Sequence, residues 1–309
     1  MFRASREFLS IAYPVSILFI LISIIAPEFS ISLAPWLVVV SVFFIGIPHG
    51  AIDHIMAAEI FDMEMKLRDQ LLFYASYLFL MLILGAVWIF YPIAGMVIFL
   101  LISIYHFGQA DMEEFLNESK PVHWFWYLLR GSFIILLIIF SDSSVTYPIL
   151  EQAMNLSEGT LSSLITGSTF SFGMSVTIYL IFVLAGMVFG QFSNQKLFLI
   201  DNLALLALFY FTGPLIGFAI YFAVWHSAGH IFEMREYFNS KGKSLSIISF
   251  YKLSLPFTLI SIFGLLMLVY LQNAFGVQEM FLTLMFILIS VLTLPHMLIV
   301  HKMYSQQQS

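Results

Sequence analysis

Eight histidines are the residues of this sequence best suited to chemistry, and most of them lie inside long apolar segments. They are His49, His54, His106, His123, His226, His230, His296 and His301. Ionisable residues inside a membrane are costly, and they usually face the interior of a helix bundle for a functional reason. The chain has no Cys, which excludes disulfides, iron–sulfur clusters and thiolate metal sites. Any metal must therefore bind to His, Asp or Glu.

The segment His-Ser-Ala-Gly-His at 226–230 spaces two histidines four residues apart. On an α-helix this spacing brings both imidazoles to nearly the same face. Such a pair can chelate zinc, iron or copper. His49 and Asp53 have the same spacing, so the carboxylate is expected to orient an imidazole from outside the ligand shell. The alternative for any one intramembrane histidine is a packing residue with a hydrogen bond.

Composition indicates what surrounds these residues. Of 309 residues, 61% are hydrophobic and 10% are charged, whereas a soluble protein carries roughly 25% charged residues to cover its surface. Lipid must therefore be the solvent for most of this chain. The formal net charge of −6 argues against a nucleic-acid partner. The predicted fold class is an all-α, polytopic integral membrane helix bundle.

Hydropathy and helix breakers predict about ten transmembrane helices. They cover 8–26, 34–58, 70–91, 93–111, 123–141, 169–191, 196–211, 214–234, 251–271 and 280–302. Most separators are short, such as 27–30 and Thr212-Gly213-Pro214, while the loop 141–168 leaves room for a short interfacial helix. No hydrophilic linker interrupts the series, so a single transmembrane domain over 1–309 is expected.

Basic residues predict the direction of the spans. They are Arg3, Arg6, Lys66, Arg68, Lys120, Lys196, Arg235, Lys241, Lys243, Lys252 and Lys302, and ten alternating spans place all of them on one side. The opposite loops contain neither Lys nor Arg. By the positive-inside rule both termini are expected to be cytoplasmic.

The same topology gathers histidines at one depth. Four spans each place one histidine at this depth, about 12–16 residues from the outer end, or roughly 18–24 Å at the helical rise. These are His49, His106, His226 and His296. Pro48 and Pro295 directly precede two of them. Because a proline inside a span frees a carbonyl that lipid cannot satisfy, both kinks are expected to face an interior site.

Two further polar residues lie at similar depth. Asp201 and Arg130 lie near the predicted cytoplasmic ends of their spans. Their depth leaves two arrangements open. Either they pair with each other, or Asp201 accepts a proton from a liganding imidazole. His54, His123 and His301 are interpreted as packing residues rather than as metal ligands.

Several classes of membrane metalloprotein require patterns that are absent. Bis-histidine haem bundles need histidine pairs two or more turns apart on two helices, desaturases need His-x-x-His-His boxes, and intramembrane zinc proteases need His-Glu-x-x-His. A buried site with no obvious general base fits oxygen activation on a lipid-soluble substrate better than hydrolysis. A transporter or channel with a His/Asp relay is the alternative from another class.

Four segments carry a resemblance to a known family. They are Gly-Ile-Pro-His-Gly-Ala-Ile-Asp-His (46–54), Ser-Ile-Tyr-His-Phe-Gly-Gln-Ala-Asp (103–111), Trp-His-Ser-Ala-Gly-His (225–230) and Leu-Pro-His-Met-Leu-Ile-Val-His (294–301). Their order and spacing resemble the Brp/Blh family of β-carotene 15,15′-dioxygenases over roughly residues 36–301.

The resemblance implies an iron-dependent membrane enzyme that cleaves β-carotene at its central double bond with O2 to give two all-trans-retinal. It implies His49, His106, His226 and His230 as iron ligands and catalytic residues, with Asp201 and His296 near them. It also implies the plasma membrane of a prokaryote as location, and leaves open a retinal-binding rhodopsin as product acceptor. Another carotenoid or another bond remains an alternative.

Overall fold

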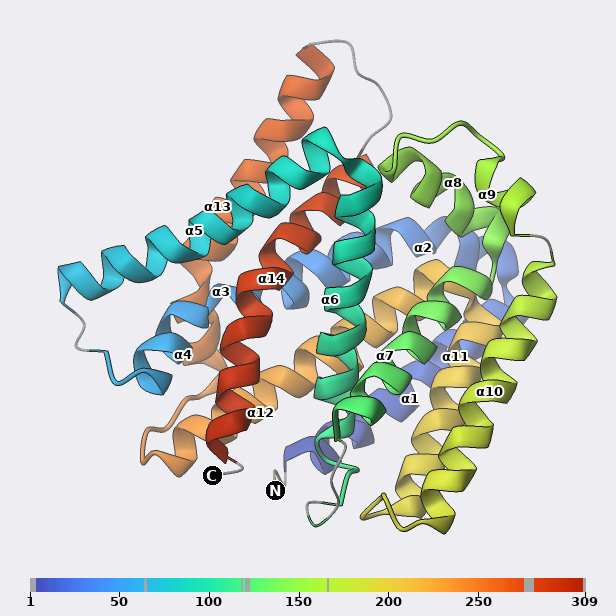
Figure 1. The fold of residues 1–309 in the computed structure, drawn as a ribbon, viewed down its shortest axis with the longest axis horizontal. Helices are drawn as coiled ribbons and strands as arrows, with labels where there is room; N and C mark the ends of the chain where they lie inside the picture. The colour runs from blue at the N-terminus through green and yellow to red at the C-terminus, as the bar shows by residue number, and fades with distance from the viewer. Residues whose placement is uncertain are drawn as a thin grey trace. The chain divides into compact units, whose positions relative to one another are not determined.

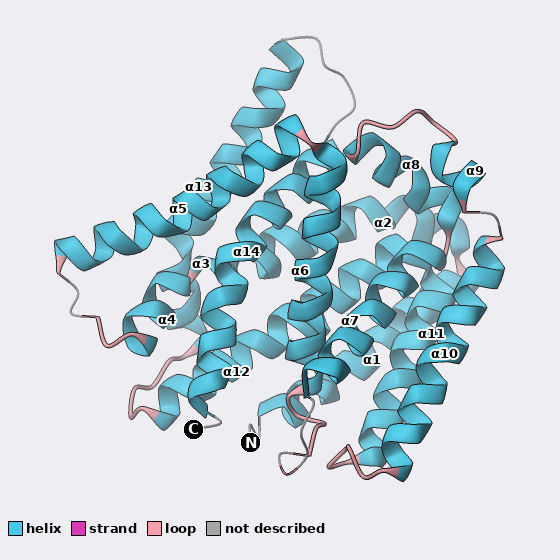
Figure 2. Cartoon of the chain, in the orientation of Figure 1, coloured by secondary structure: helices cyan, strands magenta, loops and turns pink. Residues whose placement is uncertain are grey.

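The computed structural model describes residues 4–63, 66–117, 119, 123–165, 167–274 and 281–307. Over these residues the chain is almost entirely helical, and the described part contains no β-strand (Figure 2). The prediction of an all-α fold is therefore confirmed.

Short connections join the helices (Figure 1). The first half contains α1 (Ala4–Ile25), α2 (Pro27–Ser41), the π-helical segment η1 (Val42–Gly46), α3 (Ile47–Ala51), α4 (Asp53–Ile60), α5 (Leu67–Phe90), α6 (Pro92–Met112) and α7 (His123–Phe140). The second half contains α8 (Ser143–Ala153), α9 (Thr160–Leu164), α10 (Ser168–Val188), α11 (Gln195–Ile220), the π-helical segment η2 (Tyr221–Ala228), α12 (Gly229–Ser240), α13 (Ile247–Ala274) and α14 (Phe281–Gln307).

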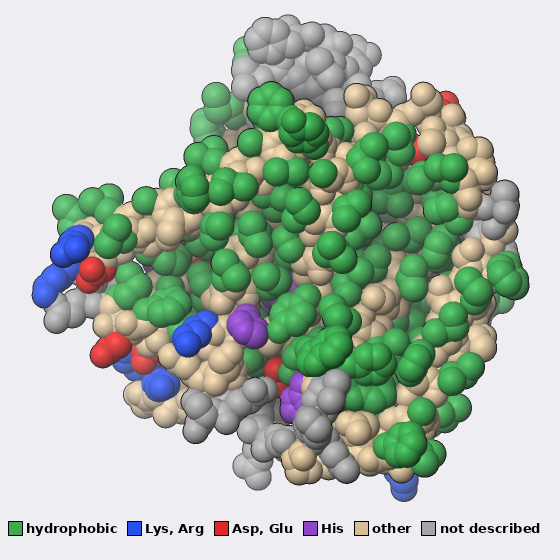
Figure 3. Space-filling model, viewed as in Figure 1, with side chains coloured by type: hydrophobic (Ala, Val, Ile, Leu, Met, Phe, Trp, Pro, Cys, Tyr) green, Lys and Arg blue, Asp and Glu red, His purple; other side chains and the backbone are tan. Residues whose placement is uncertain are grey.

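Eight segments of the described chain are long and apolar enough to cross a membrane. Large hydrophobic side chains cover their outer faces; Ile89, Leu82 and Phe263, for example, are 77%, 71% and 69% exposed. Figure 3 shows such side chains over much of the face in view. Contiguous exposed apolar surface on this scale is unfavourable in water, so lipid must cover it. The polytopic membrane bundle is confirmed.

Two helices account for the difference between these eight segments and the ten predicted spans. Leu9–Ile25 is apolar but shorter than the others. Gln195–Ser240 forms one run of 46 residues, where the sequence predicts two spans, 196–211 and 214–234. The count of ten and the cytoplasmic termini remain predictions. Of the basic residues behind that orientation, Arg3 and Lys120 lie outside the described residues.

A break at Gly213 divides the 46-residue run at the predicted separator. Gly213 has φ 70° and ψ −173°, a conformation that glycine adopts without the steric penalty of a side chain. Pro214 follows and has no N–H to continue the helical bonding. From this point the chain changes direction in Figure 1. Two helices therefore meet here, as the breaker residues predict.

Two separators differ from their predictions. The loop predicted at 27–30 is wrong, because α2 already begins at Pro27 and Ala26 alone lies between α1 and α2. Proline suits the first helical position, where its missing N–H costs nothing. The loop 141–168 contains two short helices, α8 and α9.

The chain forms two compact units, each drawn from three stretches of sequence. Unit 1 comprises Met1–Gly46, Ser103–Pro148 and Gly159–Gly242, and unit 2 comprises Ile47–Ile102, Ile149–Glu158 and Lys243–Ser309. The single domain over 1–309 remains a prediction. In unit 1, α11 packs against α1, α2 and α7, and α7 also packs against α10 (Figure 1).

Two glycines allow α6 and α7 to approach closely within unit 1. A Cβ atom on Gly131 would lie 1.7 Å from the carbonyl oxygen of Ile104, and one on Gly108 would lie 1.7 Å from the carbonyl oxygen of Tyr127. Small residues commonly permit such backbone contacts between membrane helices. This contact sets the position of the C-terminal half of α6, which carries His106.

Replacing Gly131 by Ala is therefore expected to destabilise the protein by at least about 1–3 kcal/mol, the range for an overpacked core. The blocking atom belongs to the backbone and cannot rotate away. Thermal unfolding in detergent measures the effect. Gly173→Ala on α10 is the matched control, because a Cβ there meets nothing within 4 Å. Equal melting temperatures for the two variants would contradict the close crossing.

Unit 2 is held together by contacts of α14 with α5 and of α13 with α3. Its core contains Leu84, Trp88, Met96 and Phe99. The indole Nε1 of Trp88 donates a hydrogen bond to Ser290 Oγ at 2.8 Å. These contacts position α3 and α14, the helices that carry His49 and His296.

Candidate metal centre

Three buried histidines come together in unit 1: His106 on α6, His226 on η2 and His230 on α12. Their ring centroids lie 4.8 Å apart for His106 and His226, 5.3 Å for His106 and His230, and 5.0 Å for His226 and His230. Imidazole nitrogens are suitable ligands for iron, zinc and copper. The donor set therefore fits a transition-metal ion.

The i,i+4 pair shares one face, as its spacing predicts, but the local helix is not a regular α-helix. His226 lies in the π-helical segment η2, and His230 lies in α12 directly after it. A second π-helical segment, η1, ends one residue before Ile47-Pro48-His49. Single π-helical turns are frequent at functional sites, and hydropathy gives no signal for them.

An aromatic ring supports His226 from within η2. Phe222 stacks on the His226 imidazole, with ring centroids 5.8 Å apart and planes 20° apart. A Cβ on Gly46 would lie 2.3 Å from Phe222 Cε1, so the absence of a side chain at the end of η1 leaves room for that ring. Neither Phe222 nor Gly46 has a pattern in the sequence that predicts this role.

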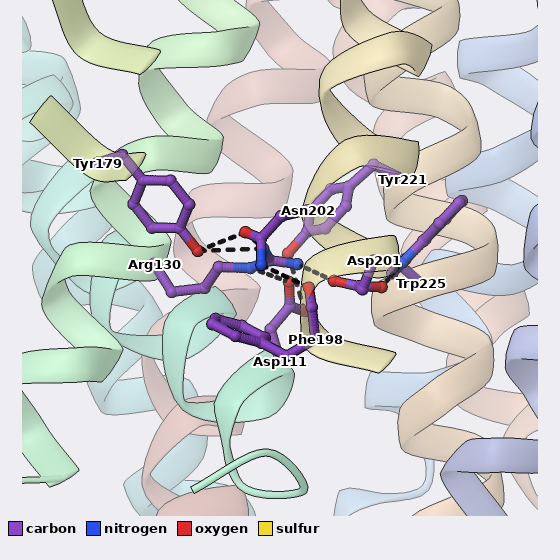
Figure 4. A network of polar contacts seen from close by, with 8 residues as sticks. All are labelled: Asp111, Arg130, Tyr179, Phe198, Asp201, Asn202, Tyr221 and Trp225. Carbon is purple, nitrogen blue, oxygen red and sulfur yellow. Dashed lines mark hydrogen bonds and ion pairs between the residues drawn. The ribbon is translucent and has the colours of Figure 1, made fainter. Parts of the chain in front are cut away.

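Of the two arrangements that the sequence leaves open for Arg130 and Asp201, the structure shows the ion pair, which belongs to a larger network (Figure 4). Arg130 Nη2 donates to Asp201 Oδ2 at 2.5 Å, and its Nε donates to Asp111 Oδ2 at 3.0 Å. Its Nη1 donates to Asn202 Oδ1 at 2.7 Å. One guanidinium thus faces two buried carboxylates, an arrangement that is stable only while every charge keeps its partners.

Two donors on η2 complete this network. Trp225 Nε1 donates to Asp201 Oδ1 at 2.8 Å, and Tyr221 Oη donates to Asp111 Oδ1 at 3.2 Å (Figure 4). Trp225 is the residue before His226. This Asp201 oxygen therefore accepts a hydrogen bond from an indole, whereas the sequence left open a bond from a liganding imidazole. Asp111 occurs in the 103–111 motif, but its pairing with an arginine 19 residues later has no local signal.

Asp201 and two of the histidines line the same small cavity in unit 1. The cavity measures about 30 Å³, and its polar lining comprises Asp111, Glu114, Asp201, His226, His230 and Glu233. A water molecule needs roughly 10–15 Å³ of such space and several polar partners. Glu233 Oε2 lies 3.2 Å from His230 Nδ1. The cavity can therefore hold water beside the histidines, and sequence analysis missed both glutamates.

Unit 2 contains the other predicted site residues. His49 on α3 and His296 on α14 are buried, and their ring centroids lie 4.8 Å apart at an angle of 89°. Asp53 was expected to orient His49, but its carboxylate accepts a hydrogen bond from His296 Nδ1 at 2.8 Å. The helix is interrupted at Ile52 between α3 and α4, so the geometry of an unbroken i,i+4 pair does not apply.

The remaining histidines have ordinary packing contacts. His54 Nδ1 lies 3.2 Å from the Ala51 carbonyl oxygen, and its ring packs on Phe257. His123 Nε2 lies 3.3 Å from the Asn117 carbonyl oxygen. His301 is exposed. The interpretation of all three as residues outside the metal site remains a prediction.

The fold and the buried imidazoles define a class, namely polytopic membrane proteins with a histidine-rich interior site. Residues 40–304 match the family described as β-carotene 15,15′-dioxygenase, and the chain belongs to this family. It is therefore a carotenoid-cleaving oxygenase. The chain is similar to a β-carotene 15,15′-dioxygenase of uncultured marine bacterium 66A03, with 26% identity over 282 residues, which cover 90% of this chain and 96% of that protein. No solved structure matches it.

Proposed function

We propose that this chain is an iron-dependent dioxygenase that cleaves β-carotene at its central 15,15′ double bond and produces two molecules of all-trans-retinal. The observation that carries the proposal is the cluster of three buried imidazoles in a chain of this family. Imidazole suits Fe(II) and leaves coordination positions for a substrate. The family relationship favours an enzyme over the transporter or channel alternative.

The proposed iron ligands and catalytic residues are His49, His106, His226 and His230. Three belong to the unit 1 cluster, and His49 is included because of its motif at 46–54. Asp53, Asp201 and His296 are proposed to support ligands from outside the coordination shell. When bound, iron would supply the redox chemistry that activates O2.

The reaction needs no net proton transfer. One C=C bond and one O–O bond break, and two C=O bonds form, so each retinal carries one oxygen atom from O2. A site without a dedicated general acid and base is sufficient for this balance. The apolar substrate and products remain in lipid, consistent with a membrane bundle. The prokaryotic plasma membrane as location and a retinal-binding rhodopsin as product acceptor belong to the same proposal.

Expression in a bacterial host that accumulates β-carotene tests the substrate and the bond together. With iron supplied, the orange colour should fade, and chromatography should show retinal as the product, approaching two molecules for each β-carotene lost. A catalytically silent variant such as His226→Ala, present in the membrane at the same level, is the control.

Other outcomes point to the alternatives. Apocarotenals of unequal length would contradict cleavage at the central bond, and activity only on a different carotenoid would contradict the substrate. Unchanged pigment with the protein verified in the membrane would contradict both. Metal-dependent flux across vesicles, without chemical change in any lipid, would then favour the transporter.

A further inference from the structure

The Asp53 carboxylate has two hydrogen-bond partners in unit 2. Its Oδ1 lies 2.8 Å from His296 Nδ1, and its Oδ2 accepts a hydrogen bond from Tyr77 Oη at 2.8 Å. The side chains of His296 and Asp53 are 5% and 4% exposed. The three residues come from α14, α4 and α5, so the carboxylate joins three helices of this unit.

This arrangement defines the tautomer of His296. An ionised carboxylate has acceptor oxygens only, so the imidazole must donate from Nδ1. In a neutral imidazole the other ring nitrogen, Nε2, then carries the lone pair. Tyr77 donates to the second carboxylate oxygen and so limits rotation of Asp53. A carboxylate that holds an imidazole in this way is the common support of histidines at metal sites.

His296 in turn lies against His49. The edge-to-face contact of these rings, 4.8 Å and 89°, matches the contact of His106 with His226 in unit 1, 4.8 Å and 83°. Gly50 follows His49 in the sequence, and a Cβ placed there would lie 3.8 Å from His296 Nδ1. The His296 ring is thus close to both the side chain of His49 and the adjacent backbone.

The geometry points to Tyr77, Asp53 and His296 as a positioning triad for His49. The carboxylate fixes the His296 ring, and that ring fixes the orientation of the His49 imidazole. This inference rests on the proposed function, because it takes His49 as an iron ligand. It extends the site to Tyr77 and assigns Asp53 to His296 rather than to His49.

The triad is tested independently of activity by measuring how tightly the purified, metal-free protein binds metal. Binding is measured with Fe(II), and with Co(II), whose visible spectrum reports its ligand geometry. Asp53→Asn and Tyr77→Phe should bind metal more weakly than the wild type, by up to the roughly 10–100-fold that removing a direct partner of a ligand costs. Tyr77→Phe should have the smaller effect, since it leaves the bond between Asp53 and His296 intact.

Glu59→Gln is the matched control. Glu59 lies on α4 like Asp53 and pairs with Lys243, so the variant removes the same charge from the same helix without touching the triad. It should bind metal like the wild type. At saturating metal the triad variants should regain most of their kcat with an altered Co(II) spectrum, a pattern that a general loss of stability does not produce.

Three outcomes would overturn the inference or its basis, and they are distinguishable. Wild-type protein that binds neither metal would contradict the proposed iron site itself. Metal binding by the wild type with equal affinity in Asp53→Asn would contradict the triad alone. Complete loss of binding in His296→Gln, equal to that of His49→Ala, would make His296 a ligand instead of a positioning residue.

Discussion

Replacing His226 by Ala is expected to abolish both iron retention and retinal formation. His226 contacts His106 and His230, with ring centroids 4.8 Å and 5.0 Å away, so it is an integral member of the unit 1 cluster. Losing one of four proposed ligands leaves three imidazoles, and the methyl group of Ala cannot substitute as a donor. Iron per protein is measured by elemental analysis, and retinal by chromatography.

His301→Ala is the control for the His226 variant, because it also removes an imidazole but His301 is exposed. It should retain iron and activity at wild-type levels. A chelator should reproduce the loss in the wild type, and added Fe(II) should reverse it there but not in His226→Ala. Full activity with iron retained in His226→Ala would remove this residue from the centre.

Replacing Arg130 by Met is expected to destabilise the protein by about 3–5 kcal/mol, the usual cost of leaving a buried charge without its partner. Two carboxylates, Asp111 and Asp201, would lose their cation at once. The side chain of Arg130 is 1% exposed, so bulk water does not reach this position to compensate the two charges. The apparent melting temperature in detergent should fall strongly, and His226 should be displaced through Trp225 and Asp201.

Two further variants refine the Arg130 prediction. Arg235→Met on α12 also removes a guanidinium, but from a half-buried side chain that lies over the ring of Phe232. A cation–π contact of this kind is worth about 0.5–1 kcal/mol at an exposed site. Arg130→Lys keeps the charge and loses the planar set of donors, so its stability should be intermediate. If Arg130→Met had the same melting temperature as Arg235→Met, the network would contribute little to stability.

Much of the fold was predictable because lipid imposes simple constraints. Backbone groups in a membrane must bond within their own helix, so apolar length predicts the helices well. The break at Gly213 and Pro214 follows from residues with special backbone geometry. The start of the second span was misplaced, because Pro27 reads as a breaker but begins a helix equally well.

The candidate site was partly predictable for a different reason. The spacing of His226 and His230 is local, so their common face follows from helical periodicity. The pairing of Arg130 with Asp201 was one of two arrangements that depth alone allowed. Depth could not identify the other members of the network, such as Asp111, Tyr221 and Trp225, because any polar residue at that level would qualify.

The sequence by itself determined the solvent of this protein, its helical class, the absence of thiolate ligands and the family to which its motifs belong. Only the tertiary structure decided which polar groups meet. Asp53 bonds to His296, 243 residues away, although His49 is nearer along the chain. Partners on different helices depend on the rotation and depth of each helix, and a shift of one residue turns a side chain by about 100°. Hydropathy locates a span to within several residues, which is too coarse to select a hydrogen-bond partner.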